Sequence, residues 1–296
     1  MEDLGVSMLR AGEIELSIRK KFHKQLFSAF ARAINEYELL SPGDRVAVCI
    51  SGGKDSMLAA KLFQELKRHN KFEFDLKFIC MDPGYLPENR ALIESNAALL
   101  EIPLHIFESP IFEAVTTVDK SPCYLCARMR RGYLYRQAQE LGCNKIALGH
   151  HYDDVIETIL MGMLYGGQVQ TMMPKIHSTN FPGMELIRPM YLIREQDIIH
   201  WRDYNGLRFL RCACRFTEAA EKGRVLNENA NSGELSKRLE VKKLIAALKE
   251  VNPYVESNIF RSVENVNLST VIAWKQNGKT HRFTEWYDAE QKEEEM

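Results

Sequence analysis

The sequence predicts an α/β protein built on a doubly wound parallel sheet, with an N-terminal helix and a C-terminal helical appendage. Two observations predict this class. Short apolar runs alternate with amphipathic stretches between residues 44 and 190, and a glycine-rich turn joins the first apolar run to the first amphipathic stretch. Strands that alternate with helices in this way form parallel sheets, because each helix returns the chain to the same end of the sheet.

The predicted elements follow one another regularly. A basic amphipathic helix is expected over residues 18–34, before the strand "DRVAVCI" at 44–50. The glycine-rich turn then leads into a helix over 54–70, whose Leu58, Leu62 and Leu66 lie on one face. The alternation continues with strands at 74–82, 104–107 and 144–150 and with an apolar segment at 185–190. Helices are expected at 86–101, from the cysteine pair at 123 and 126 to about residue 139, and at 153–166.

The chain divides into three predicted parts. Residues 1–40 form an N-terminal helical segment, residues 41–214 form the α/β domain, and residues 215–296 form a C-terminal extension. The extension begins as a polar loop and continues as helices, of which Pro253 opens the second. The first of these helices is supported by apolar residues at helical spacing: Leu239, Leu244, Ile245 and Leu248. An acidic tail at 290–296 is expected to be solvated.

Composition excludes several classes of protein. No run of 18 apolar residues is present, and the first 40 residues are too charged for a secretion signal, so a cytoplasmic protein with no membrane partner is expected. The net charge is −1, so any nucleic-acid surface must be a local patch. The seven cysteines of a cytoplasmic chain do not indicate a disulfide framework, and Cys49 and Cys80 are expected as apolar fillers of buried strands.

The segment that carries the strongest chemical signal is "SGGKDS", from Ser51 to Ser56, at the end of the first strand. Gly52 and Gly53 allow a tight turn that presents backbone N–H groups, and the following helix adds the positive end of its dipole. Lys54 adds a charge, and the hydroxyls of the two serines can donate to phosphate oxygens. The segment therefore predicts a site for the phosphate chain of a nucleotide.

Two further strand ends should face the same crevice, because ligands bind at the carboxyl ends of strands in open α/β sheets. "GHHYDD" places Gly149, His150 and Asp154 there, and carboxylates at this point can hold Mg²⁺ on bound phosphates. The alternative is that an aspartate caps the helix while the histidines pack in the interior. Asp82, in "CMDPGY", ends a third strand where an adenosine would lie.

The cysteine pair in "KSPCYLCARMRRGYLYRQA" admits several interpretations. Cys123 and Cys126 have the C-x-x-C spacing that lets two thiolates reach one metal centre. The same spacing fits half of a zinc site or a redox pair.

The hexapeptide "SGGKDS" resembles the fingerprint of the PP-loop ATP pyrophosphatases. Together with "CYLCARMRRGYLYR", "GHHYDDVIETILMGMLYGG" and "LIRP", in this order and spacing, it makes the chain resemble the tRNA 2-thiocytidine biosynthesis family over about residues 22 to 214. The resemblance implies a PP-loop fold of the adenine nucleotide α-hydrolase type. It also implies ATP-dependent thiolation of a tRNA cytidine, with Lys54, Asp55 and Asp154 as catalytic residues.

In that family the cysteine pair and a third cysteine farther along bind a [4Fe-4S] cluster. The resemblance therefore implies Cys123 and Cys126 as ligands. The third ligand falls in "FLRCACRFTE", where the sequence departs from the family's C-x-x-C: alignment on the second cysteine selects Cys214, with Cys212 as the competitor. If both bind, four thiolates would equally make a closed structural zinc site.

The helix after the cysteine pair combines basic and aromatic residues. The resemblance makes tRNA the expected partner, and this helix would offer charges to phosphates and the rings of Tyr133 and Tyr135 to unstacked bases. The basic residues expected to bind RNA are Arg128, Arg130, Arg131 and Arg136. The helix at 18–34 could be a second tRNA-facing arm or an ordinary packed helix.

The function that follows is ATP-dependent tRNA sulfur transfer: ATP adenylates the C2 oxygen of a cytidine, and sulfur carried on the cluster replaces it. ATP, Mg²⁺ and the cluster are the expected cofactors. Cysteine desulfurase or sulfide is the expected sulfur donor, and a homodimer is possible. The alternative is a PP-loop enzyme that activates a small molecule and holds a four-cysteine structural zinc.

Overall fold

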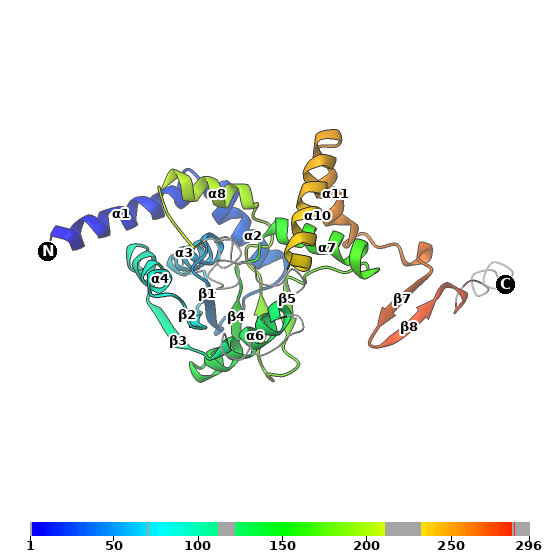
Figure 1. The fold of residues 1–296 in the computed structure, drawn as a ribbon, viewed down its shortest axis with the longest axis horizontal. Coiled ribbons are helices and arrows are strands. Elements are labelled where there is room, and N and C mark those ends of the chain that lie inside the picture. Colours follow the sequence, from blue (N-terminus) through cyan, green and yellow to red (C-terminus); the bar gives the residue numbers. More distant parts are fainter. Residues whose placement is uncertain (1, 70, 112–121, 211–231, 286, 288–296) are drawn as a thin grey trace.

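We describe the fold from a computed structural model, which describes residues 2–69, 71–111, 122–210, 232–285 and 287. Its main sheet has six strands in the order β3-β2-β1-β4-β6-β5, and five of them are parallel (Figure 1). They are β1 (Arg45–Ile50), β2 (Asp75–Asp82), β3 (Leu104–Glu108), β4 (Lys145–Ala147) and β6 (Glu185–Ile187). The predicted parallel sheet is thus confirmed.

The sixth strand, β5 (Lys175–His177), runs antiparallel to β6 at the edge of the sheet and was not predicted. It is only three residues long and largely exposed, so it has neither the length nor the apolar run by which a strand is recognised in a sequence.

Helices cover both faces of the sheet, as a doubly wound fold requires. On one face β1 packs against α3 (Lys54–Arg68), α4 (Pro87–Leu99) and α8 (Glu195–Tyr204), and Trp201 of α8 is fully buried there. On the other face α6 (Pro122–Glu140) packs through Leu134 and Ala138. Helix α8 was not predicted, although Ile198 and Trp201 give it a buried face.

The N-terminal segment is part of the core. Three helical segments replace the single helix predicted over 18–34: α1 (Glu2–Arg19), the π-helical turn η1 (His23–Phe27) and α2 (Ser28–Glu36). Their apolar side chains Phe22, Leu26, Phe30 and Ile34 are buried among those of the first face. The segment is therefore a packed element rather than a free arm.

A buried ion cluster fastens α1 to α3. The Glu15 carboxylate accepts hydrogen bonds from Lys61 Nζ at 2.6 Å and Arg68 Nη2 at 2.7 Å, and Lys61 also donates to the Leu100 carbonyl at 2.8 Å. Burial opposes ionisation of Glu15, but its hydrogen bonds with Arg68 and Lys61 outweigh it and lower the pKa to about 2. Lys61 is 1% exposed, so its charge depends on this partner.

Replacement of Glu15 by glutamine is expected to lower the free energy of unfolding by about 3 kcal/mol at pH 7, because it leaves a buried lysine without its counter-charge. The pKa of Glu15 is lower in the folded state, so its stabilisation is present above pH 4.5 and is lost as the pH falls toward 2. The measurement is urea unfolding of both proteins at several pH values. Glu13→Gln, at an exposed position of α1, is the matched control. A gap between Glu15→Gln and wild type that persists unchanged at pH 2 would contradict this account.

The C-terminal extension contains the two predicted helices, α10 (Ser232–Val251) and α11 (Val255–Ser262), which pack on α7 (Tyr152–Gly166). The apolar residues that predicted α10 are not all buried. Val241 and Ile245 are buried, whereas Leu239, Leu244 and Leu248 are exposed. Two apolar stripes lie side by side on this helix, and periodicity alone does not decide which of them is buried.

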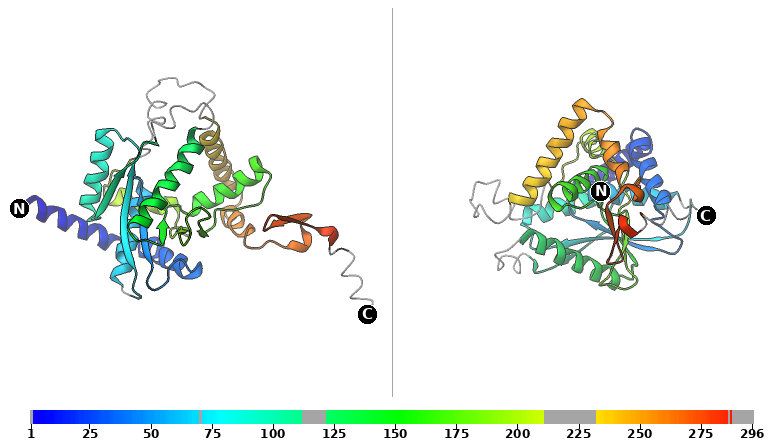
Figure 2. Two further views of the ribbon diagram at one scale, coloured as in Figure 1. Left: turned by 90° about the horizontal axis from the view of Figure 1, so that it is seen from below. Right: turned by 90° about the vertical axis from the view of Figure 1, so that its right-hand side faces the viewer.

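The extension ends in elements that were not predicted. After the turn η2 (Leu268–Thr270), the strands β7 (Ala273–Gln276) and β8 (Lys279–Arg282) form a hairpin, followed by the turn η3 (Phe283–Glu285). Figure 2 shows the hairpin projecting away from the main sheet. The part of the chain that the structure describes contains no helix both long and apolar enough to span a bilayer.

Candidate active site

The loop between β1 and α3 needs glycine. Gly52 has φ +83°, a conformation that L side chains rarely adopt, and a Cβ there would lie 2.6 Å from Ile93 Cγ1. Its carbonyl accepts a hydrogen bond from the Leu210 backbone N–H at 3.2 Å. Gly53 is the N-cap of α3, so the loop leads directly into the positive end of that helix.

The two serines of the loop have different roles. Ser56 is buried; its hydroxyl donates to the Gly53 carbonyl at 3.0 Å and accepts from the Ser51 backbone N–H at 3.1 Å. That hydroxyl therefore closes the loop. Ser51 is exposed, and its hydroxyl lies 3.1 Å from that of Ser56. Of the two predicted phosphate donors, Ser51 is thus the exposed one.

Lys54 lies between two carboxylates. Its Nζ is 3.1 Å from Asp55 Oδ1 and 3.1 Å from Glu195 Oε1, at the start of α8. Burial alone would lower the pKa of Lys54, but these carboxylates raise it, so the ammonium stays charged. Glu195 is a residue that sequence reasoning missed. Burial opposes its ionisation, yet Lys242 and Lys54 lower its pKa to about 2.

The β4–α7 loop approaches the phosphate loop closely. A Cβ on Gly149 would lie 3.1 Å from the Asp55 carbonyl carbon and from the Ser56 nitrogen, so a side chain there would separate the loops. His151 Nε2 is 3.9 Å from Asp55 Oδ1. The structure thus brings together the two segments that the sequence places at one crevice.

The capping alternative for the "GHHYDD" segment is confirmed. The Asp154 carboxylate accepts from the His151 backbone N–H at 3.0 Å, and the His151 side chain accepts in return from the Asp154 N–H at 3.4 Å. Asp154 also pairs with Arg238 at 2.8 Å, and Asp153 pairs with Arg194 at 3.0 Å. Both carboxylates therefore have cationic partners, and a Mg²⁺ ion bound by Asp154 would compete with Arg238.

His150 follows β4 and Asp82 ends β2, the two strands on either side of β1. Burial lowers the pKa of His150 to about 4, so the ring is neutral at pH 7, and its Nδ1 is buried without a hydrogen-bond partner. The Asp82 carboxylate accepts from the backbone N–H groups of Gly84 and Tyr85 and pairs with Arg90 at 3.0 Å. Asp82 therefore shapes the turn after β2.

Helix α10 adds cations that the sequence did not assign to the site. Lys242 Nζ lies 2.5 Å from Glu195 Oε2, and Arg238 lies 2.8 Å from Asp154 and 3.4 Å from Glu157. Residues from the C-terminal extension thereby neutralise carboxylates of the nucleotide crevice. The only signal in the sequence was that both basic residues fall on one helix at a spacing of four.

The basic helix α6 differs in part from expectation. Arg131 and Arg136 are exposed, and the Arg136 guanidinium lies 6.0 Å from the centre of the Tyr133 ring, whereas Arg130 is partly buried. Tyr135 is 5% exposed and stacks on Phe181 at 5.1 Å, so the idea that it could stack on an RNA base is wrong. The side chain of Arg128 lies outside the described residues.

The cysteines fall into two groups. Cys49, Cys80 and Cys143 are buried, and burial raises the pKa of each, that of Cys80 to about 12, so they remain thiols and are unsuited to metal binding. Cys123 and Cys126 lie three residues apart near the start of α6.

The side chains of this pair, and all of Cys212 and Cys214, lie outside the described residues. Within the described part of the chain, no three His, Cys, Asp or Glu side chains are grouped for a metal ion. The expected cluster ligands therefore remain predictions.

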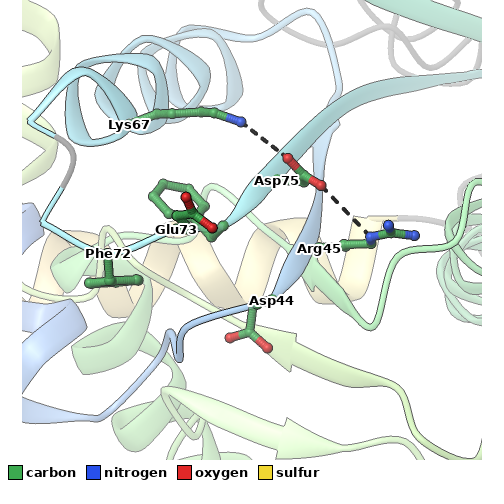
Figure 3. A pocket seen from close by; sticks show the side chains of 8 residues that line it. Asp44, Arg45, Lys67, Phe72, Glu73 and Asp75 are labelled. Atoms are coloured by element: carbon green, nitrogen blue, oxygen red, sulfur yellow. Dashed lines mark hydrogen bonds and ion pairs between the residues drawn. The ribbon is translucent and has the colours of Figure 1, made fainter.

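A separate cavity of about 540 Å³ lies at the opposite end of the strands, where β1 and β2 begin (Figure 3). Asp75 bridges Arg45 and Lys67 there, at 3.7 and 3.3 Å. Because these charges satisfy one another and lie away from the carboxyl ends of the strands, we assign no function to this cavity.

A doubly wound sheet whose first strand ends in a glycine-rich loop bearing a lysine defines the PP-loop class of nucleotide-binding enzymes, and residues 20–214 match the PP-loop domain family. Within that class, the chain belongs to the tRNA-cytidine(32) 2-sulfurtransferase family.

Two relatives support this assignment, and one solved structure supports the fold. The chain is 34% identical over 257 residues to the tRNA-cytidine(32) 2-sulfurtransferase of Coxiella burnetii (strain CbuG_Q212), covering 86% of this chain and 94% of that protein. It is 33% identical to the Neisseria meningitidis serogroup C (strain 053442) protein of the same name, covering 79% and 74%. The fold resembles that of the U34-tRNA thiolase NcsA from Methanococcus maripaludis with its [4Fe-4S] cluster, with TM-score 0.60, 20% identity and 82% of both chains.

Proposed function

We propose that this protein is an ATP-dependent tRNA sulfurtransferase that replaces the C2 oxygen of cytidine 32 with sulfur. The observation that carries the proposal is the identity to tRNA-cytidine(32) 2-sulfurtransferases over most of both chains. The charged Lys54 in a glycine-rich loop at the carboxyl end of β1 supports it, because such a loop suits a nucleotide triphosphate.

The nucleotide would lie across the ends of β1, β2 and β4. Backbone N–H groups of Gly52 and Gly53, the Ser51 hydroxyl and the Lys54 ammonium would bind its phosphates. Asp82 would face the adenosine, while Gly149 and His150 would line the wall toward β4. A Mg²⁺ ion on the phosphates would take oxygen ligands from Asp55 or Asp154.

The first step activates the base. The C2 oxygen of the cytidine attacks the α-phosphorus of ATP, and pyrophosphate leaves. Charge grows on the phosphate oxygens in this step, and Lys54 is fixed by Asp55 and Glu195 where it can stabilise that charge. Sulfur then attacks C2, the C2–O bond breaks, and AMP leaves.

We infer that Cys123, Cys126 and Cys214 hold a [4Fe-4S] cluster, with Cys212 as the competitor for the third position. The spacing of the first two on α6 fits such a site, and the buried cysteines with raised pKa do not. Three protein ligands leave one iron position open, at which the sulfur for transfer can be held. The protein's own part is to position the base between this site and the phosphate loop.

The tRNA would contact α6, through the basic side chains named above: Arg128, Arg130, Arg131 and Arg136. Arg131 and Arg136 support this best, since both are exposed. We further propose a cytoplasmic enzyme that receives sulfur from a cysteine desulfurase or from sulfide, and we keep a homodimer as a possibility.

The test is a thiolation assay with anaerobically purified full-length protein, ATP, sulfide and a tRNA transcript with cytidine at position 32. We expect the mass increase of one oxygen-to-sulfur exchange at that nucleoside, and none with a transcript carrying uridine there. RNA affinity should fall as salt rises, and charge reversal at Arg131 and Arg136 should weaken it without changing ATP affinity.

Colourless protein with stoichiometric zinc, which consumes ATP with a small molecule and ignores tRNA at low salt, would contradict the proposal. It would favour the alternative of small-molecule activation with a structural zinc.

A further inference from the structure

Two side-chain nitrogens at the carboxyl ends of β4 and β6, His150 Nδ1 and Arg188 Nε, are buried without a hydrogen-bond partner, and so is Arg130 Nε on α6. His150 follows β4, and Arg188 directly follows β6, which is the parallel neighbour of β4. Arg130 comes from α6, which covers one face of these strands. Buried polar atoms in proteins are rarely left unpaired, so each such group requires an explanation.

The charge of Arg188 is not balanced by the described residues. Its Nη1 donates to the Met173 carbonyl, and no ion pair to a carboxylate is formed within the described part of the chain. Burial, followed by the charge of nearby Arg131, lowers its pKa to about 10, so it is still a cation at pH 7. The nearby carboxylate of Asp154 is already paired with Arg238.

An anion would satisfy this arrangement. A partly buried guanidinium beside a second one is unfavourable until a negative group lies between them. Arginine forks match the oxygens of a phosphate, and a neutral histidine can donate one further hydrogen bond. The same side chains offer no carboxylate ligand for a metal ion.

We propose that Arg188, Arg131 and His150 form a pocket for one phosphate group of the RNA, beside the nucleotide that is modified. This inference rests on the proposed function. Arg188 is a positioning residue in this account, because it would hold the backbone next to the reacting base.

The position of the pocket favours RNA over ATP as the source of the phosphate. The loop at β1 already provides Lys54 for the ATP phosphates. Strand β4 lies between β1 and β6, so with strands ~4.8 Å apart Arg188 is displaced by roughly 10 Å from that loop, and His150 on β4 lies between the two. The pocket also lies on the side toward α6, which carries the exposed Arg131.

The experiment measures binding of a tRNA anticodon stem-loop by Arg188→Gln in the full-length protein. We expect RNA affinity to fall about tenfold or more, as for a lost charge-assisted hydrogen bond. The slope of the logarithm of the binding constant against the logarithm of the salt concentration should become shallower by about one. ATP affinity should be unchanged. The matched control is Lys175→Gln on the adjacent strand β5, which removes the same charge from a lysine that bonds the Glu38 carbonyl at 3.0 Å.

A double-mutant cycle identifies the phosphate. A set of stem-loops carries one uncharged methylphosphonate each, at successive positions near nucleotide 32. One of them should bind the wild-type protein more weakly than the unmodified stem-loop does. For Arg188→Gln, that same stem-loop and the unmodified one should bind equally well. Arg188→Lys keeps the charge and should recover part of the affinity. Arg188→Lys also distinguishes loss of phosphate binding from loss of folding. Thermal unfolding of each variant checks that it is folded.

The outcomes are distinct. Equal RNA affinity and salt slope in folded Arg188→Gln, while wild type thiolates cytidine 32, would overturn the pocket and leave the proposed function intact. A loss confined to ATP or pyrophosphate affinity would overturn the RNA assignment. Wild-type protein that binds no RNA would instead refute the proposed function.

Discussion

Lys54→Ala is expected to lower the rate of ATP-dependent thiolation by about a hundredfold to a thousandfold while the protein remains folded. Rates fall by this much when an enzyme loses one preorganised group that stabilises charge in the transition state. Lys54 is held between Asp55 and Glu195 at 3.1 Å from each, so its charge is positioned before ATP arrives. Asp55→Ala should be similarly damaging, because it removes one of the two groups that position this lysine and a candidate ligand for Mg²⁺.

Single-turnover thiolation and ATP binding measure this effect. Lys67→Ala is the matched control, because that lysine lies in the last turn of the same helix, is half exposed, and contacts Asp75 and the Phe74 ring. Thermal unfolding should show folded protein for each variant. Full activity of purified Lys54→Ala or Asp55→Ala would refute the role assigned to the phosphate loop.

Cys123→Ala and Cys126→Ala should each lose the bound iron and all thiolation, because two of the proposed cluster ligands lie in the first turn of α6. Cys214→Ala should do the same, and Cys212→Ala should not. Iron content and the absorption of anaerobically purified variants measure the effect without reference to activity.

The buried cysteines are the controls for this series. Cys80→Ala and Cys143→Ala should keep their iron and lose only stability, by about 1 kcal/mol, since they remove a small buried group. Iron kept in Cys214→Ala but lost in Cys212→Ala would reverse the choice of the third ligand. Iron kept in Cys123→Ala would remove the pair from the site.

The parallel strands could be predicted because each is a short apolar run next to an amphipathic helix, although β3 is only partly buried. The phosphate loop could be predicted because its chemistry is contiguous, from Ser51 to Ser56. The edge strand β5 and the hairpin β7–β8 could not, since both are short and exposed. The hairpin did carry one signal, the dipeptide Asn277-Gly278 at positive φ, which is typical of a two-residue turn between paired strands, whereas β5 carries no comparable signal.

Contacts at the site between residues far apart in the sequence are a second kind of feature that could not be predicted. Glu195 meets Lys54 across 141 positions, and Arg238 meets Asp154 across 84. These pairs form because α8 and α10 pack beside the crevice. The local periodicity of a sequence does not specify where a helix packs. The burial of Tyr135 has the same origin, because it depends on Phe181.

The ion pairs from α10 to the crevice have a consequence for the order of events in synthesis. Without Lys242 and Arg238, the crevice would present Glu195, Asp154 and Glu157 with fewer counter-charges to a polyanionic nucleotide. These cations leave the ribosome after the whole PP-loop domain. We therefore expect a nascent chain to bind ATP more weakly until α10 has docked on the domain, because fewer cations balance those carboxylates before then.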